Sequence, residues 1–168
     1  MLHFMHALTR QSPARVSSFL FGTQLTSISR LLQNRDVDES IAAVARAVPD
    51  WSGGTRISTS LAEFNHVWSR RVLGQGAVVL LMTDGLDRDT STDLSVQMDR
   101  LHKSCHELIW LNPLLRYDKF APKSRSVQTM LAHVDRFVPV HSLDAISQLV
   151  SLLSRPDNRL YNDLSDWQ

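Results

Sequence analysis

Thr55 and Asp84 are the residues of this sequence whose types and positions best favour chemistry at a binding site. Thr55 follows two glycines and opens a helix that we predict over residues 58–72. Asp84 comes after the apolar run 77–82, which has the pattern of a parallel strand buried on both faces. Ligands of open α/β sheets bind at the carboxyl ends of the strands, and a hydroxyl and a carboxylate placed there suit a hard cation such as Mg²⁺.

Each of these residues also has a purely structural interpretation. An Asp-Gly pair such as Asp84-Gly85 is typical of a turn, and a threonine such as Thr55 before a helix can serve as its N-cap. Asp87 and Asp89 fit solvated loop charges or helix caps better than metal ligands. The position of Asp84 behind a buried strand, with Thr55 upstream, favours the metal interpretation over the turn.

The elements that must position Thr55 and Asp84 alternate between helices and strands. Two short strands, 16–21 and 24–28, are joined by so short a turn that they must form an antiparallel hairpin. Pro139 cannot donate a hydrogen bond to a neighbouring strand, so the strand 137–140 is expected at an edge. The helix over 58–72 is expected to turn Leu61, Phe64, Val67 and Trp68 inward. Further helices are predicted over 1–10, 36–48, 92–103 and 124–132, with another strand at 106–111 and a last helix from Ser142 or Asp144.

This order of elements predicts an α/β fold with a doubly wound, Rossmann-like, mostly parallel sheet and one antiparallel edge hairpin. The 168 residues are enough for one domain, which we place at residues 1–154, followed by a polar tail at 155–168. Lys and Arg number 18 and Asp and Glu 17, a balance that argues against nucleic-acid or membrane-surface binding. The single cysteine, Cys105, excludes an intramolecular disulfide, and no apolar run approaches a membrane span, so a cytoplasmic location is expected.

Several segments resemble the von Willebrand factor A (VWA) domain of the CoxE-like family. They are Phe19-Leu20-Phe21-Gly22-Thr23-Gln24-Leu25, Asp50-Trp51-Ser52-Gly53-Gly54-Thr55-Arg56-Ile57, Leu80-Leu81-Met82-Thr83-Asp84-Gly85-Leu86-Asp87-Arg88 and Leu108-Ile109-Trp110-Leu111-Asn112-Pro113-Leu114. Each segment is short, but their order and spacing together are specific, and the resemblance extends to about Ser154.

The resemblance implies a metal-dependent function in protein binding. VWA domains hold Mg²⁺ in a metal-ion-dependent adhesion site, whose ligands come from an Asp-x-Ser-x-Ser loop, a separate Thr and a separate Asp. Thr55 matches that Thr and Asp84 the last Asp, and Trp51, Arg56 and Asp87 are expected to shape the contact with a partner. The partner's carboxylate completes the coordination, so the module is not an enzyme. The family further implies work with a MoxR-type AAA+ ATPase in the maturation of metalloenzymes such as carbon monoxide dehydrogenase.

One departure from the family concerns the metal site itself, because no Asp-x-Ser-x-Ser occurs in this sequence. In the family that motif ends the first strand, so we expect an N-terminally truncated domain whose sheet lacks its first central strand, between 16–21 and 77–82. Two protein ligands make a poor site for an ion that dehydrates reluctantly, so Mg²⁺ should bind weakly or not at all. A segment from elsewhere fills the gap, the two strands close up, or the fold is marginally stable.

Two other functions stay open at this point. The first is a metal-free remnant that acts as a scaffold, which the missing motif favours. The second is a small α/β hydrolytic enzyme that uses Asp84 as an acid, a base or a metal ligand, although the sequence names no second catalytic group for it.

Overall fold

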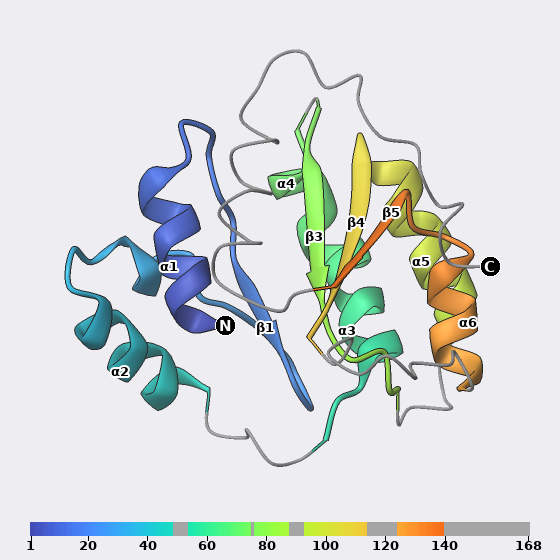
Figure 1. Cartoon of the computed structure of the whole chain (residues 1–168), viewed down its shortest axis with the longest axis horizontal. Coiled ribbons are helices and arrows are strands. Elements are labelled where there is room, and N and C mark those ends of the chain that lie inside the picture. Colours follow the sequence, from blue (N-terminus) through green and yellow to red (C-terminus); the bar gives the residue numbers. More distant parts are fainter. Residues whose placement is uncertain (49–53, 75, 88–92, 114–123, 140–168) are drawn as a thin grey trace.

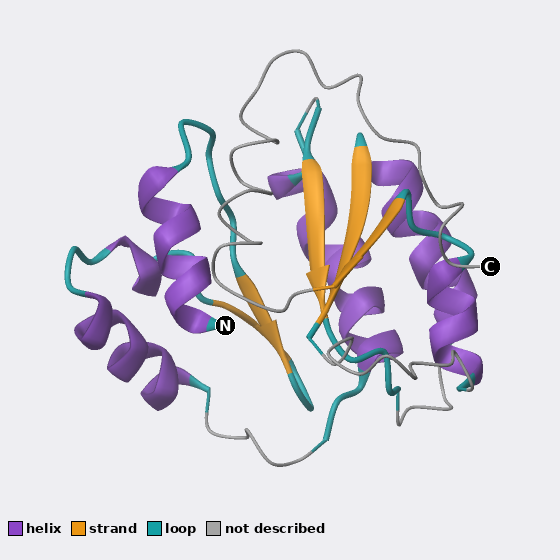
Figure 2. Ribbon diagram, viewed as in Figure 1, coloured by secondary structure: helices purple, strands orange, loops and turns teal. Residues whose placement is uncertain are grey.

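The strands form two separate sheets in the computed structural model, which describes residues 1–48, 54–74, 76–87, 93–113 and 124–139 (Figures 1 and 2). The strands β3 (Val78–Met82), β4 (Glu107–Asn112) and β5 (Arg136–Pro139) are parallel and lie in the order β3-β4-β5. The strands β1 (Phe19–Phe21) and β2 (Leu25–Ser27) pair antiparallel. The predicted mixed α/β fold and its hairpin are thus confirmed, and the last strand lies at the edge of the sheet that the described strands form.

Three of the described helices begin after a residue that caps them. Asp36, Asp93 and Ser124 each accept backbone hydrogen bonds from the first turn that follows, which satisfies N–H groups that have no partner within the helix. None of the described helices combines the length and apolarity that a membrane crossing requires. The helices are α1 (Leu2–Gln11), α2 (Val37–Ala47), α3 (Ile57–Glu63), α4 (Ser69–Val72), α5 (Leu94–Ser104) and α6 (Arg125–Leu131), with a 3₁₀ turn at Leu31–Gln33.

The long helix predicted over 58–72 differs from the prediction at its centre. A π-helical stretch, Phe64–Trp68, separates α3 from α4. Its wider turn rotates the following side chains away from the α-helical register. Val67 was predicted to face inward but is 37% exposed, whereas Ser69 is buried.

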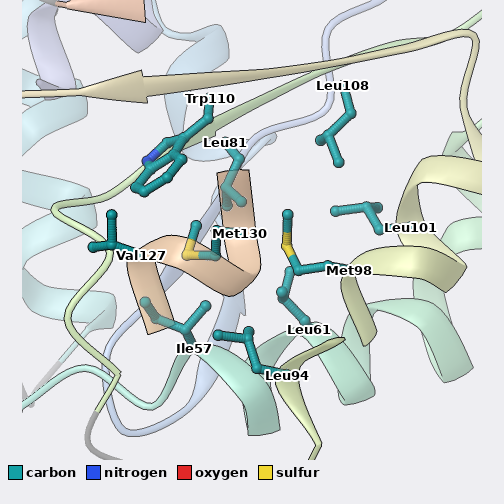
Figure 3. Close-up of a cluster of buried hydrophobic side chains, with 10 residues drawn as sticks. All are labelled: Ile57, Leu61, Leu81, Leu94, Met98, Leu101, Leu108, Trp110, Val127 and Met130. Atoms are coloured by element: carbon teal, nitrogen blue, oxygen red, sulfur yellow. The ribbon is translucent and has the colours of Figure 1, made fainter. Parts of the chain in front are cut away.

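Helices cover both faces of the parallel sheet. On one face, α3, α5 and α6 pack around the fully buried Trp110 of β4 (Figure 3). On the other face, Phe4 of α1 packs against Ile109 and Leu111, which alternate with Trp110 along β4. Burial of both faces is what a doubly wound fold requires. The first cluster consists of Ile57, Leu61, Leu81, Leu94, Met98, Leu101, Leu108, Trp110, Val127 and Met130.

The burial of β3 is lower than its apolar sequence predicts. Val78 is 36% exposed and only Leu81 of this strand is fully buried, whereas β4 is buried from Leu108 to Asn112. The reason is that β4 has a strand on each side, while β3 has a described neighbour on one edge only. Nor does β1 pair with β3, so the two strands beside the predicted gap have not closed up.

Candidate functional site

A cavity of roughly 1030 Å³, which we call the inter-strand cavity, is lined by β1, β3, α1 and α3 and by both Thr55 and Asp84. Asp84 lies just beyond the end of β3, and Thr55 lies just before α3. The backbone N–H of Arg56 donates to the carbonyl of Gly22, which follows β1, at 3.0 Å. The start of α3 is therefore held at the carboxyl end of β1, and the sequence-predicted metal ligands line the same cavity at this edge.

Asp84 forms a turn as well as lining the cavity. Its Oδ1 accepts a hydrogen bond from the N–H of Leu86 at 3.0 Å. Gly85 between them has a φ of 78°, a conformation that glycine adopts without steric cost. The turn that the sequence predicted as the structural role of Asp84-Gly85 therefore occurs in the structure. The other carboxylate oxygen, Oδ2, receives no hydrogen bond from the described residues.

Asp87, in the loop after β3, forms hydrogen bonds with the start of α3. Its two carboxylate oxygens accept from the N–H groups of Ile57 at 3.0 Å and Ser58 at 3.1 Å, and from the Ser58 hydroxyl. The residue at the N-cap position of α3, Arg56, makes no side-chain capping bond, so Asp87 supplies the cap from a distant part of the chain. These contacts give the Asp87 carboxylate a structural role within the domain.

The sequence also predicted Arg56 and Trp51 as partner contacts. Arg56 is exposed beside Thr55, so its guanidinium is accessible at the same edge as the cavity. Trp51 lies outside the described residues, and its predicted role stays a prediction.

The donors at this edge are of the right kind for Mg²⁺ but are too few. Mg²⁺ prefers oxygen ligands in a near-octahedral arrangement. Thr55 offers one hydroxyl and Asp84 one carboxylate, and no group of three or more His, Cys, Asp or Glu residues that could hold a metal occurs in the described part of the chain. These residues alone therefore do not fit a complete magnesium site, and further oxygen donors are needed.

Ser60 is a polar residue of the cavity wall that the sequence analysis did not identify. It is 3% exposed, and its hydroxyl has no hydrogen-bond partner in the described structure. Apolar periodicity does not identify a serine on the buried side of a helix, because serine is polar. The signal available was the polar run Ser58-Thr59-Ser60 at the start of a helix whose neighbours Ile57 and Leu61 are apolar.

The parallel sheet with helices on both faces places the chain in the class of doubly wound α/β domains. The comparison of sequences specifies the family. The family described as "VWA domain containing CoxE-like protein" matches residues 1–146, and the chain belongs to it.

The comparison of structures supports the same fold. The chain is similar to proximal thread matrix protein 1 from the mussel byssus, with a TM-score of 0.54 and 17% sequence identity. The match covers 90% of this chain and 38% of that chain, so this chain spans less than half the length of its structural relative. Identity this low shows a shared fold alone. No curated protein matches the sequence significantly.

Proposed function

We propose that this chain is a non-catalytic module that binds a partner protein at the edge formed by Thr55 and Asp84. One observation supports the proposal above the others: these two residues, from different parts of the chain, line the same cavity at the carboxyl ends of strands. In open α/β sheets this is where ligands bind. The exposed Arg56 lies beside the edge and suits a partner with an acidic group.

We propose further that Mg²⁺ binds weakly at this edge through Thr55 and Asp84, and more tightly when other oxygen donors join them. When bound, the ion would offer a coordination position to a partner carboxylate. As a member of the CoxE-like family, the chain would serve a MoxR-type AAA+ ATPase in the maturation of a metalloenzyme such as carbon monoxide dehydrogenase.

The metal part of the proposal is tested by titrating Mg²⁺ into the wild-type chain and into Asp84→Asn by isothermal calorimetry. We expect weak binding in the wild type and none in Asp84→Asn, because the amide removes the charge that attracts the ion. Asp38→Asn is the matched control, since it makes the same change at an exposed site on α2. If wild type and Asp84→Asn bind Mg²⁺ equally, Asp84 is not a ligand.

The partner is tested separately by measuring the binding of a MoxR-type AAA+ ATPase to the immobilised chain, with Mg²⁺ or with EDTA. We expect binding that is weakened by EDTA, by Asp84→Ala and by Arg56→Glu, and that Asp38→Ala leaves unchanged. Lack of binding under every condition would contradict the ATPase as partner.

A metal-free scaffold is the second candidate, and the incomplete donor set favours it specifically. It predicts that partner binding persists in EDTA and in Asp84→Ala, whereas Arg56→Glu still weakens it. The same binding experiment therefore separates the two candidates.

A hydrolytic function has less support. Ser95 and His133 form the hydroxyl–imidazole pair that such chemistry uses, with 2.9 Å between Oγ and Nε2. However, no carboxylate among the described residues is hydrogen-bonded to His133, and neither residue lines the inter-strand cavity. The pair thus lacks both the orienting acid and the enclosed site that would make it a catalytic arrangement.

A further inference from the structure

Leu86 is a large apolar side chain that lies beside the proposed binding edge, two residues after Asp84. It is 52% exposed and belongs to none of the described core clusters. Neither Leu86 nor Arg56 lines the inter-strand cavity, so the exposure of these two side chains does not depend on what occupies that cavity. Single exposed leucines are common on protein surfaces, so the exposure of Leu86 does not by itself indicate a binding site.

The backbone on the N-terminal side of Leu86 is held in one conformation. The N–H of Leu86 donates to Oδ1 of Asp84 at 3.0 Å. Gly85 has a φ of 78°, and its carbonyl accepts a hydrogen bond from the Ser126 hydroxyl at 2.7 Å. A Cβ at Gly85 would lie 2.6 Å from Cζ2 of the buried Trp110, so the turn packs directly on the core. The core and α6 therefore fix the position of this turn.

The backbone on the C-terminal side of Leu86 is held as well. The carboxylate of Asp87 accepts from the N–H groups of Ile57 at 3.0 Å and Ser58 at 3.1 Å. Leu86 is thus fixed on both sides while its own side chain stays exposed. A contact residue on a fixed backbone loses little conformational entropy when a partner covers it, whereas a loose loop would first have to be ordered. The position of Leu86 therefore favours a role in binding.

The hydrogen bond between Asp87 and Ile57 also brings a positive charge near Leu86. Leu86 precedes Asp87 and Arg56 precedes Ile57, so standard bond lengths place the Cα atoms of Leu86 and Arg56 at most about 13 Å apart. Arg56 is exposed, makes no side-chain capping bond and forms no ion pair within the described part of the chain. Its guanidinium suits a carboxylate, and Leu86 beside it suits a large apolar side chain.

We propose that Leu86 and Arg56 together select the partner protein, which offers an acidic side chain to Arg56 and a large apolar side chain to Leu86. This inference rests on the proposed function, since it assumes that a partner binds at the edge formed by Thr55 and Asp84. The two partner residues lie at alternate positions of an extended segment. Such positions share one face and are about 7 Å apart, a separation that the long side chain of Arg56 can accommodate. The contact with Leu86 needs no metal.

A synthetic peptide with the sequence Gly-Ser-Glu-Ser-Phe-Ser-Gly, blocked at both ends, tests the proposal in the presence of EDTA. Binding is followed by NMR of the chain labelled at leucine methyls and arginine side chains. We expect the peptide to shift the methyl resonances of Leu86 and the Nε–H resonance of Arg56. Replacing the peptide Phe by Ser should weaken binding by about tenfold, because apolar burial is lost. Replacing its Glu by Gln should weaken binding by about threefold, as expected for an exposed ion pair.

Variants of the chain show whether each peptide side chain meets the residue assigned to it. In Leu86→Ser, exchanging the peptide Phe for Ser should change the affinity by less than about twofold, because the contact is already lost. In Arg56→Glu, a peptide with Lys in place of Glu should bind more tightly than the original peptide. Val67→Ser is the matched control, because Val67 is 37% exposed and lies further along the same helical segment, away from its start at Ile57. It should leave every affinity unchanged.

Two results on the wild-type chain would overturn the proposal without the use of any variant. Equal binding of the Phe and Ser peptides would remove the contact with Leu86, and the proposed binding edge would stand if the Glu still paired with Arg56. Absence of shifts at about 10 mM peptide, where even millimolar affinity is detected, would remove both contacts. Failure of Asp84 to bind Mg²⁺ would leave these peptide results unaffected, so the metal site and the present proposal fail separately.

Other occupants would give different results in the same experiment. If sodium octanoate, which joins a carboxylate to an alkyl chain, shifted the same resonances at lower concentration than the peptide, the occupant would be a fatty acid. If the resonances of Leu86 and Arg56 shifted without peptide as the protein concentration rose, and sedimentation showed a dimer, the occupant would be a second copy of this chain. Either result would overturn the assignment to a segment of a partner protein.

Discussion

The carboxylate of Asp87 accepts a hydrogen bond from the N–H of Ile57 at 3.0 Å, which ties the loop after β3 to the first turn of α3. Because Asp84 and Thr55 flank these two segments, the same contact keeps both candidate site residues at one edge of the molecule. Asp87 was a candidate partner contact in the sequence, and in the structure it also positions the other candidates.

Removal of the Asp87 carboxylate should destabilise the fold. Asp87→Ala leaves the N–H groups of Ile57 and Ser58 without their partner, and we expect a loss of about 1–2 kcal/mol in the free energy of unfolding, measured with urea. Asp38→Ala, an exposed position on α2, is the control and should change it by less than about 0.5 kcal/mol. Equal stability of the two variants would show that the cap contributes little.

Gly85 is expected to tolerate no side chain. A Cβ built there lies 2.6 Å from Cζ2 of Trp110 and 2.9 Å from Cγ2 of Val127, in a backbone with a φ of 78°. Gly85→Ala should cost about 2–4 kcal/mol in the free energy of unfolding, from strain and overpacking together. Gly76→Ala separates the two causes, because that glycine has a φ of 74° with open space around it, and should cost only about 1 kcal/mol. At Gly74 a Cβ meets nothing within 4 Å, so Gly74→Ala should be close to neutral.

Cys105 should react slowly with thiol reagents. Burial, and secondarily the negative charge of Asp135, raises the pKa of its thiol to about 11. At pH 8 the fraction of thiolate is then small, and alkylation by iodoacetamide should be on the order of a hundredfold slower than at an exposed cysteine. The reference is the double variant Ser104→Cys/Cys105→Ser, which moves the thiol to an adjacent exposed position. Similar rates at the two positions would contradict the shifted pKa.

Asp135 should make the fold sensitive to acid. Burial alone raises the pKa of its carboxyl, but hydrogen bonds from the N–H of Leu108 at 2.7 Å and from His102 at 2.9 Å outweigh burial and lower the pKa below 3.8. A folded pKa below the unfolded one means that the ionised carboxylate stabilises the fold above about pH 5. This stabilisation disappears as the pH falls through 3.8 toward the folded pKa.

The corresponding measurement is urea unfolding between pH 3 and pH 7 for the wild type and for Asp135→Asn. The wild type should lose its stability advantage over Asp135→Asn as the pH falls, because the variant cannot ionise at this position. Asp38→Asn should follow the wild-type curve. Parallel curves for wild type and Asp135→Asn would mean that the hydrogen bonds do not favour the charged form.

Local patterns in the sequence were enough to predict most elements and the class of fold. The apolar run 106–111 became β4, the most buried strand, and a short turn forced the hairpin. The helices predicted over 36–48 and 92–103 occur as α2 and α5, and the nearby Asp36 and Asp93 cap their first turns. Thr55 and Asp84 were found from strand-end position and family resemblance, and the structure places both on one cavity.

Contacts between segments distant in the sequence decided the structural features that the sequence analysis did not predict. The π-helical stretch that exposes Val67, the cap that Asp87 provides for α3, and the approach of Trp110 to Gly85 each depend on elements packed together after folding. Periodicity describes one element at a time, so it could not reveal these contacts. The inter-strand cavity is likewise a tertiary result, because α1, β1, α3 and β3, which line it, are separate in the sequence.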